Sequence, residues 1–108
     1  MRVISKTRLR LFWENEPAAE AALRRWHSIV SRASWSAPPD VKVTFGKNVD
    51  FVEVASGNTV GVFNVHGNTY RLIAAMHFVT KSPKKGRVYV LRVMAHEEYD
   101  LNQWKEEL

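Results

Sequence analysis

The sequence predicts one α+β domain over residues 1–108, in which two N-terminal helices pack on a small antiparallel sheet and a short helix follows at the C-terminus. Three observations lead to this prediction. The chain has 108 residues, which is the size of one domain rather than two. Apolar residues recur at helical spacing in the first third of the chain. The second half contains runs rich in Val, Ile, Phe and Tyr, which favour strands.

The first helix is expected directly after a short edge strand at Arg2–Ile4. Ser5 can cap this helix, because a serine hydroxyl accepts a hydrogen bond from the open N–H groups of a first turn. The apolar face of the helix carries Leu9, Phe12 and Trp13. We expect the helix to end at Asn15–Pro17, since proline interrupts the backbone hydrogen bonds of a helix.

The second helix is expected to begin at Pro17, because proline suits a first turn. Its apolar face is formed by residues that recur at helical spacing: Ala22, Trp26, Ile29, Val30 and Ala33. The segment Trp35–Pro39 ends this helix. Beyond it, Asp40–Phe45 alternates apolar and polar residues, and we expect a short strand or an extended loop there.

Further along the chain, the β-rich segments are Phe51–Ala55, Thr59–His66, Thr69–Thr80 and Arg87–Ala95. Gly67-Asn68 is a two-residue hairpin signal, and a loop of this length pairs Asn64 with Arg71. Strand residues alternate between the two faces of a sheet. One face of the hairpin is therefore apolar and suits the helices: Phe63, Val65, Tyr70, Leu72, Ala74, Met76 and Phe78. The other, open face carries Asn64, Arg71 and His77.

The last strand has two sides of similar hydrophobicity. One side consists of Val88, Val90, Arg92 and Met94, and the other of Tyr89, Leu91 and Val93. We expect the second set in the core, because a guanidinium is rarely buried without a partner. This choice places Arg92 and His96 beside Arg71 on the open face. A short amphipathic C-terminal helix is expected to dock on the domain through Leu101, Trp104 and Leu108.

The charge balance of the chain favours an anionic partner. There are 16 Lys and Arg residues against 11 Asp and Glu, which gives a net charge of +5. Such a protein attracts polyanions, so nucleic acid or an acidic protein is the favoured partner. The alternative is that the basic excess only aids solubility.

The absence of cysteine from the sequence excludes disulfides, thiolate catalysis and cysteine-ligated metal sites. The acidic residues show none of the spacings typical of a metal site, so we expect neither a metal nor another cofactor. The N-terminus has too short an apolar run for a signal peptide, and no segment is apolar enough to span a membrane. We therefore expect a cytoplasmic protein.

Two segments carry a specific pattern of residues. The first is Phe63-Asn64-x-x-Gly67-Asn68-x-x-Arg71, and the second is Arg92-x-x-x-His96-x-Glu98-Tyr99-Asp100. In this order and spacing the chain resembles the HigB toxins, and the likeness extends upstream to a Trp-x-x-Pro segment at Trp35–Pro38. The resemblance implies a RelE-like microbial ribonuclease fold and ribosome-dependent cleavage of messenger RNA, which inhibits translation. It also implies neutralisation by a HigA-type antitoxin with a helix-turn-helix domain.

RNA cleavage without a metal begins when a ribose 2′-hydroxyl attacks the adjacent phosphate. The reaction needs a base for that hydroxyl, an acid for the leaving 5′-oxygen and cations for the charged phosphorane. Arg71 suits the last role, because a guanidinium presents several donors to phosphate oxygens. Arg92 is either a second phosphate ligand or the partner of Asp100 or Glu98 in an ion pair.

Given the resemblance, His96 is the favoured acid–base residue, because imidazole titrates near neutral pH. Tyr99 is expected to stack on a base or to donate a hydrogen bond to the reacting phosphate, and its alternative role is packing of the C-terminal helix. The remaining histidines are expected to be solvated or structural: His27, His66 and His77.

Docking on RNA or the ribosome is expected to use Asn64 on the open face and a basic run formed by Lys81, Lys84, Lys85 and Arg87, because phosphate neutralisation dominates such binding. The alternative for the basic run is a solvated hairpin tip. Basic strands and aromatic residues alone do not separate cleavage from binding. The alternative function is therefore a non-enzymatic RNA- or ribosome-binding module.

Overall fold

The computed structural model describes residues 1–79 and 86–108, and the predicted docking residues Lys81, Lys84 and Lys85 lie outside these ranges. The helices are α1 (Lys6–Asn15), α2 (Glu20–Arg32), α3 (Pro38–Phe45), α4 (His96–Asp100) and α5 (Gln103–Glu107), with short 3₁₀ turns at Pro17–Ala19 and Gly46–Asn48. The strands are β1 (Arg2–Ile4), β2 (Val49–Glu53), β3 (Thr59–Val65), β4 (Tyr70–His77) and β5 (Arg87–Ala95). The predicted α+β class is confirmed.

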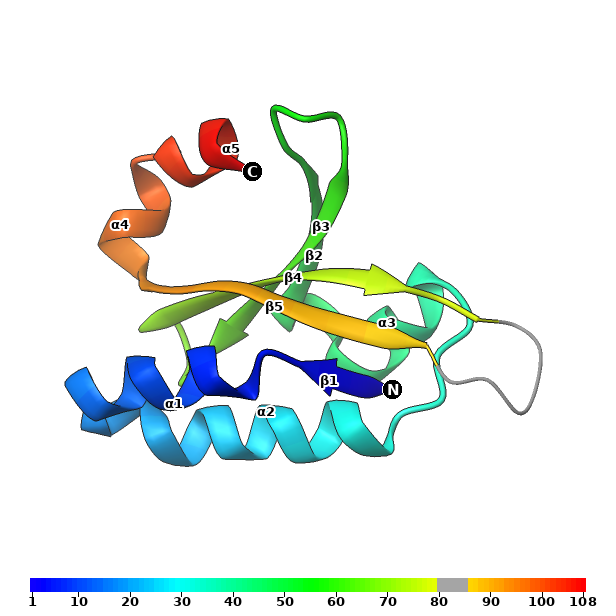
Figure 1. Ribbon diagram of the computed structural model, residues 1–108, viewed down its shortest axis with the longest axis horizontal. Helices are drawn as coiled ribbons and strands as arrows, with labels where there is room; N and C mark the ends of the chain where they lie inside the picture. Colours follow the sequence, from blue (N-terminus) through cyan, green and yellow to red (C-terminus); the bar gives the residue numbers. More distant parts are fainter. Residues whose placement is uncertain (80–85) are drawn as a thin grey trace.

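Within the described residues, the strands form one five-stranded sheet in the order β1-β5-β4-β3-β2. Neighbouring strands from β2 to β5 are antiparallel, whereas β1 joins the edge of the sheet parallel to β5. The sheet is therefore mixed, and the expectation of a purely antiparallel sheet is corrected at this edge. A parallel pair needs a long connection between its strands. Here the helices and the other strands separate β1 from β5 along the chain (Figure 1).

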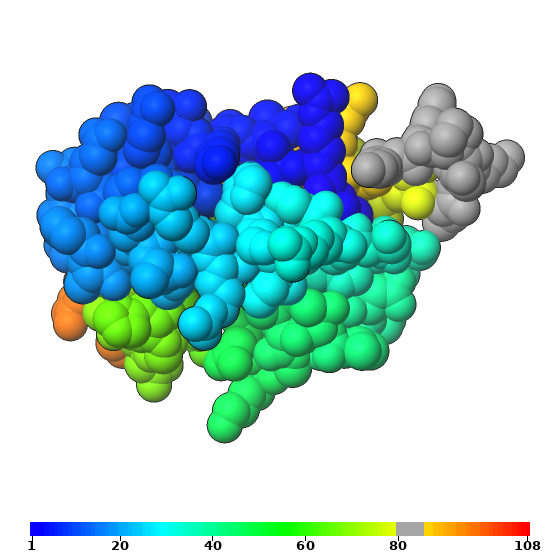
Figure 2. Space-filling view, turned by 90° about the horizontal axis from the view of Figure 1, so that it is seen from below, coloured from blue at the N-terminus to red at the C-terminus, as the bar shows by residue number. Residues whose placement is uncertain are grey.

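The helices α1 and α2 cover one face of the sheet, as predicted (Figure 1). Figure 2, which views the molecule from below, shows this side covered largely by the N-terminal part of the chain. The predicted apolar hairpin face lies here, with Phe63 and Leu72 both 0% exposed. Trp26 of α2 packs edge-on against Phe63, with their ring centroids 5.4 Å apart. The predicted hairpin register is also confirmed, since Asn64 pairs with Arg71.

The segment Asp40–Phe45 belongs to helix α3, so the prediction of a strand or loop was wrong. Pro38 occupies the first turn, where its fixed φ favours a helix. Val41 and Phe45 are four residues apart. Val41 belongs to the main core, the larger cluster of buried side chains between the helices and the sheet, and Phe45 packs against that core. Val43 points away from it and is 86% exposed. The apparent alternation arose because an exposed valine lies between two residues of the buried helical face.

A β-bulge divides β5 into two halves. Arg92 pairs with Ile73 and Val90 pairs with Ala74, so Leu91 has no partner on β4. An extra residue reverses the alternation of faces beyond it. Val88 and Val90 therefore lie in the main core, whereas the prediction had placed them on the open face. The prediction was wrong for Tyr89 and Leu91, which lie outside the main core, and correct for Val93, which packs against it.

A second, smaller core lies on the open face. It consists of Val54, Val60, Val62, Ile73, Met94 and Trp104. The predicted docking of the C-terminal segment is confirmed for Trp104, which is 2% exposed, and wrong for Leu101, which is 67% exposed. The reason is a break between α4 and α5, where Asn102 adopts a left-handed backbone with φ 63°. The carbonyl of Lys105 accepts a hydrogen bond of 2.9 Å from the N–H of Ala55, which ties α5 to the loop after β2.

None of the helices in the described parts of the chain has the length and hydrophobicity to cross a membrane.

Candidate active site

Three of the predicted catalytic residues, Arg71, His96 and Tyr99, lie where the β3–β4 turn meets the end of β5 and the start of α4. Left-handed φ angles at His66 (55°) and Gly67 (63°) form this turn. The Thr69 N–H donates to the His66 carbonyl at 3.1 Å, and the Thr69 carbonyl accepts a 3.0 Å hydrogen bond from the His96 N–H. One short turn therefore anchors both the start of β4 and the start of α4.

Arg71 is a buried cation whose side chain is fixed by neutral acceptors. Its exposed fraction is 8%. Nη1 donates to the carbonyls of Asn68 and Tyr70 at 3.2 and 3.1 Å, and Nη2 donates to Oδ1 of Asn68 at 3.2 Å. Within residues 1–79 and 86–108, no carboxylate lies within ion-pair distance of Arg71. A desolvated cation without a counter-ion is a strong site for an incoming anion.

Tyr99 lies beside Arg71 and is held by the C-terminal segment. The Cζ atom of Arg71 is 5.6 Å from the centroid of the Tyr99 ring. On its other side the ring stacks with Trp104, at 5.1 Å between centroids and 19° between planes. The Nε1 of Trp104 donates to the Tyr99 carbonyl at 3.1 Å. Tyr99 therefore packs the C-terminal helix, which is its predicted alternative role, and it also contacts Arg71.

The pKa of the Tyr99 hydroxyl is raised, chiefly by burial. The carboxylates of Asp50 and Asp100 raise it further, while the charge of Arg71 lowers it. A phenol normally titrates near pH 10, so a raised pKa keeps this hydroxyl protonated at neutral pH. Tyr99 can therefore donate a hydrogen bond at neutral pH.

His96 begins α4 and contacts a carboxylate one turn later. Its Nε2 lies 3.2 Å from Oδ2 of Asp100, and the two side chains are 42% and 57% exposed. Its Nδ1 is buried and, in the described part of the structure, has no hydrogen-bond partner. The ring therefore presents Nε2 toward solvent and Asp100. An exposed pair of this kind contributes little to stability and is easily exchanged for another anion.

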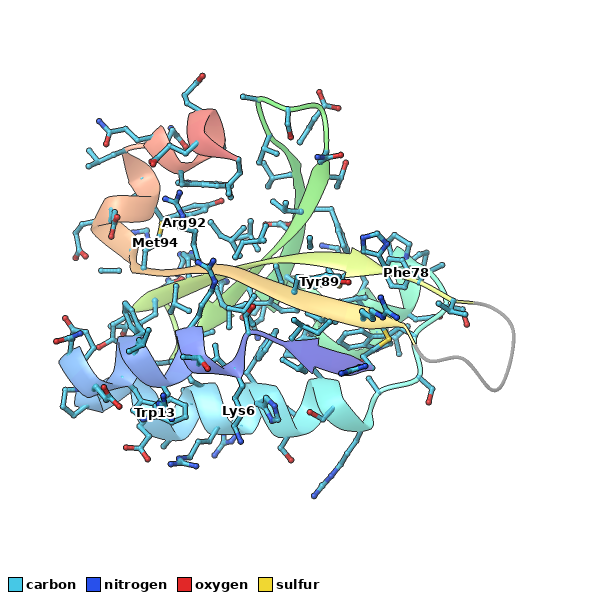
Figure 3. All side chains as sticks on the ribbon, viewed as in Figure 1. Lys6, Trp13, Phe78, Tyr89, Arg92 and Met94 are labelled. Atoms are coloured by element: carbon cyan, nitrogen blue, oxygen red, sulfur yellow. The ribbon has the colours of Figure 1, made fainter. Side chains whose placement is uncertain are left out.

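Arg92 shares the open face with Arg71 but has a partner of its own. Its Nη2 lies 3.4 Å from Oε2 of Glu107 in α5. The alternative of an ion pair was thus correct, but the predicted partners Asp100 and Glu98 were wrong. Figure 3 shows Arg92 and Met94 on the side of β5 that faces the C-terminal helices. Arg92 therefore links β5 to α5.

The structure separates the other predicted residues. Asn64 is half-buried opposite Arg71 in the β3–β4 register. Arg87 is exposed at the far end of β5, where it pairs with His77 of β4. The three lysines of the basic run lie outside the described residues, as stated above. Sequence reasoning assigned no role to Asn68 and only a packing role to Trp104. Asn68 was part of the first residue pattern, but its contact with Arg71 depends on the shape of the turn.

Among the described residues, no group of three or more His, Asp or Glu side chains is arranged to hold a metal ion.

A comparison with protein families matches most of the chain to a family of toxins. The model of the HigB toxin family, described as the RelE-like toxic component of a toxin–antitoxin system, matches residues 19–102. This range contains both residue patterns and Arg71, Arg92, His96 and Tyr99. A comparison with curated proteins gives no match.

Proposed function

Since the chain belongs to the HigB toxin family, the RelE-like toxic component of toxin–antitoxin systems, we propose that it is an endoribonuclease that cleaves messenger RNA on the ribosome. The family implies an antitoxin partner. We propose that this partner is a HigA-type protein with a helix-turn-helix domain. Cleavage of messenger RNA during translation would make the chain an inhibitor of protein synthesis.

The observation that supports cleavage most directly is the state of Arg71. Its guanidinium is 8% exposed and donates only to neutral oxygens. Donors fixed in advance in a poorly hydrated site stabilise developing negative charge at little reorganisation cost. The proposed role of Arg71 is to bind the non-bridging oxygens of the scissile phosphate and to stabilise the phosphorane.

The proposed reaction is attack of a ribose 2′-oxygen on the adjacent phosphorus. A bond forms between the 2′-oxygen and phosphorus, and the bond from phosphorus to the 5′-oxygen breaks. The products are a 2′,3′-cyclic phosphate and a free 5′-hydroxyl. Tyr99, protonated at neutral pH, donates a hydrogen bond to the phosphate.

The 2′-hydroxyl loses a proton and the leaving 5′-oxygen gains one. His96 is proposed to make one of these transfers through Nε2, since Nδ1 is buried, and water makes the other. Nε2 contacts Asp100 at 3.2 Å, so the imidazole must exchange this carboxylate for the substrate before it acts. Arg92 adds positive charge on the same face, but its contact with Glu107 makes it a weaker phosphate ligand than Arg71.

The docking proposal concerns a different set of residues. We propose that Lys81, Lys84, Lys85 and Arg87 contact ribosomal RNA and that Asn64 contacts the messenger. Their replacement by alanine should weaken ribosome association in a salt-dependent way. Single-turnover cleavage at saturating ribosome should change little in the lysine and Arg87 variants, because docking precedes the chemical step. This expectation does not extend to Asn64, which pairs with Arg71.

The experiment that tests the function uses ribosomes programmed with a defined messenger. The unaltered protein and His96→Ala are added in excess, and both ribosome binding and messenger cleavage are measured over time. We expect equal binding and a cleavage rate lower by about a hundredfold to ten-thousandfold in His96→Ala, which is the usual contribution of general acid–base catalysis. Binding by the unaltered protein without any cleavage would instead identify an RNA- or ribosome-binding module. Equal cleavage of naked RNA would contradict the dependence on the ribosome.

A further inference from the structure

A pocket of about 900 Å³ lies away from Arg71, at the edge of the sheet where β1 meets β5. Its walls come from α2 and from the ends of β1, β4 and β5. Arg71 and His77 are at opposite ends of β4, and a strand advances about 3.3 Å per residue, so about 20 Å separates the two ends. In Figure 3, Tyr89 of the pocket lies toward the opposite end of β5 from Arg92 and Met94.

The floor of the pocket carries a row of basic side chains on three adjacent strands. Arg2 of β1 pairs with Arg87 of β5, and Arg87 pairs with His77 of β4. Paired residues project from the same face of a sheet, so these three side chains lie side by side. All three are exposed. Arg2 and Arg87 carry like charges on neighbouring strands, and like charges directly opposite each other are destabilising.

No acidic residue lines the pocket. Within the described ranges, neither Arg2 nor Arg87 forms an ion pair. The segment 80–85, which the structure leaves undescribed, contains no Asp or Glu in the sequence. No carboxylate that lines the pocket or belongs to residues 80–85 therefore neutralises Arg2 and Arg87.

The remaining walls combine aromatic rings with a polar edge. Tyr89 is half-buried, and its ring packs edge-on against His77, with centroids 5.6 Å apart. His27 and Ser31 of α2 form the opposite wall and contact each other at 3.4 Å through Nδ1 and Oγ. The pKa of His27 is lowered by burial and by the charge of Lys6, which is consistent with surroundings that lack a carboxylate.

We infer that this pocket binds one nucleotide of single-stranded RNA, with its phosphate on the row formed by Arg2, Arg87 and His77 and its base against Tyr89. Single-stranded RNA is recognised by splaying bases onto Tyr or His rings while cations neutralise the backbone. The volume falls in the range of small-ligand sites. An acidic peptide would use the cations but has no need of the aromatic wall, so RNA fits the pocket better.

This inference goes beyond the cleavage site and requires no catalysis. It adds Arg2, His27, His77 and Tyr89 to the predicted docking residue Arg87. RNA that reached both sites would extend about 20 Å across the sheet, from the phosphate at Arg71 to the pocket.

The test measures binding of a fluorescent single-stranded oligonucleotide with 2′-O-methyl riboses, which cannot be cleaved by 2′-oxygen attack. Affinity for the full chain is determined by anisotropy over a series of salt concentrations. The variants are the double change Arg2→Gln with Arg87→Gln, and the single changes Tyr89→Leu and Tyr89→Phe. The control double variant is Arg10→Gln with Arg24→Gln, which removes the same charge from α1 and α2 outside this pocket. Circular dichroism and thermal unfolding confirm that each variant folds.

We expect the Arg2 and Arg87 double variant to lose tenfold or more in affinity and to reduce the salt slope by about 0.7, which corresponds to one neutralised phosphate on a single strand. Tyr89→Leu should weaken binding by about fivefold or more, as the loss of one base–aromatic stack does, while Tyr89→Phe retains it. Tyr89→Leu should not alter binding of an abasic oligonucleotide of the same length.

Three results would overturn the inference. The first is equal RNA affinity of the Arg2 and Arg87 double variant and the control double variant. The second is an equal effect of Tyr89→Leu on the abasic oligonucleotide, which would mean that no base enters the pocket. The third is that the Arg2 and Arg87 double variant binds RNA as the unaltered protein does but no longer co-purifies with the antitoxin, which would assign the pocket to a protein partner. Because the oligonucleotide is not cleaved, failure here leaves the proposed nuclease function untouched, and failure of cleavage leaves this site untouched.

Discussion

Replacement of Arg71 by alanine should nearly abolish cleavage on bound ribosomes. The guanidinium is held by three hydrogen bonds to Asn68 and Tyr70, and no carboxylate in the described ranges competes for it. Loss of one fixed donor to a developing oxyanion costs about 2.7–4 kcal/mol, which is about a hundredfold to a thousandfold in rate. Arg71→Lys keeps the charge but loses the planar fork of donors, so its rate should lie between those of alanine and arginine.

The same change also affects stability, and the two effects must be separated. A hydrogen bond with a charged partner contributes about 1.5–3 kcal/mol. The three bonds of Arg71 share one guanidinium whose burial has its own cost, so they do not add. We therefore expect Arg71→Ala to lower the free energy of unfolding by about 1.5–3 kcal/mol in total. A typical domain retains enough of its stability of about 5–15 kcal/mol to stay folded after this loss.

The assay is single-turnover cleavage of a messenger on programmed ribosomes, with each variant in excess and its fold verified by circular dichroism. Arg10→Ala is the matched control, because it removes one positive charge from α1, where the side chain is 59% exposed and 3.6 Å from Glu14. The control should cleave at the unaltered rate. If folded Arg71→Ala binds ribosomes and cleaves as fast as Arg10→Ala, the guanidinium has no part in the reaction, and the reasoning from its burial is wrong.

Two further predictions follow from the packing of the molecule. Trp104→Ala should lower the free energy of unfolding, measured in urea, by about 3–5 kcal/mol, because the indole is 2% exposed. It should also slow cleavage, because Tyr99 loses its stacking partner, and Trp104→Phe should recover most of the rate. A Trp104→Ala protein that is destabilised but fully active would show that Tyr99 needs no such support. The lowered pKa of His27 means that the folded state favours the neutral imidazole more than the unfolded state does. Protonation therefore favours unfolding: the free energy of unfolding is highest above the ordinary pKa of 6.5 and decreases as the pH falls from 6.5 toward the folded-state pKa. Lys6→Gln removes one of the two causes of that shift, so its urea midpoint should fall less between pH 7.5 and pH 5.5 than that of the unaltered protein, and an equal fall in both would contradict the assigned cause.

Helices α1 and α2, the β3–β4 register and the open-face position of Arg71 could be predicted from the sequence. Each depends on local geometry: apolar residues at helical spacing mark one face of a helix, and a two-residue hairpin signal sets which residues pair. The resemblance to the HigB toxins rests on residues within two short segments, and the family match over residues 19–102 confirms it.

The helix at Asp40–Phe45 could not be predicted in the same way, because Val43 is exposed and makes the segment alternate like a strand. Nor could the partner of Arg92, which lies 15 residues further along the chain on a separate helix. Both depend on which surfaces of distant segments meet.

The sequence by itself thus determined the α+β class, the family and the identity of the candidate catalytic residues, since these follow from short-range patterns. Only the tertiary structure decided which side of β5 is buried, because the bulge at Leu91 arises from its pairing with β4 and reverses the alternation within one strand. Only the tertiary structure, likewise, left Arg71 buried without a carboxylate in the described ranges and set Arg2, Arg87 and His77 in one row. The sequence lists the charges of the chain, but the distances between them, and therefore their electrostatic energies, exist only after strands from opposite ends of the chain have paired.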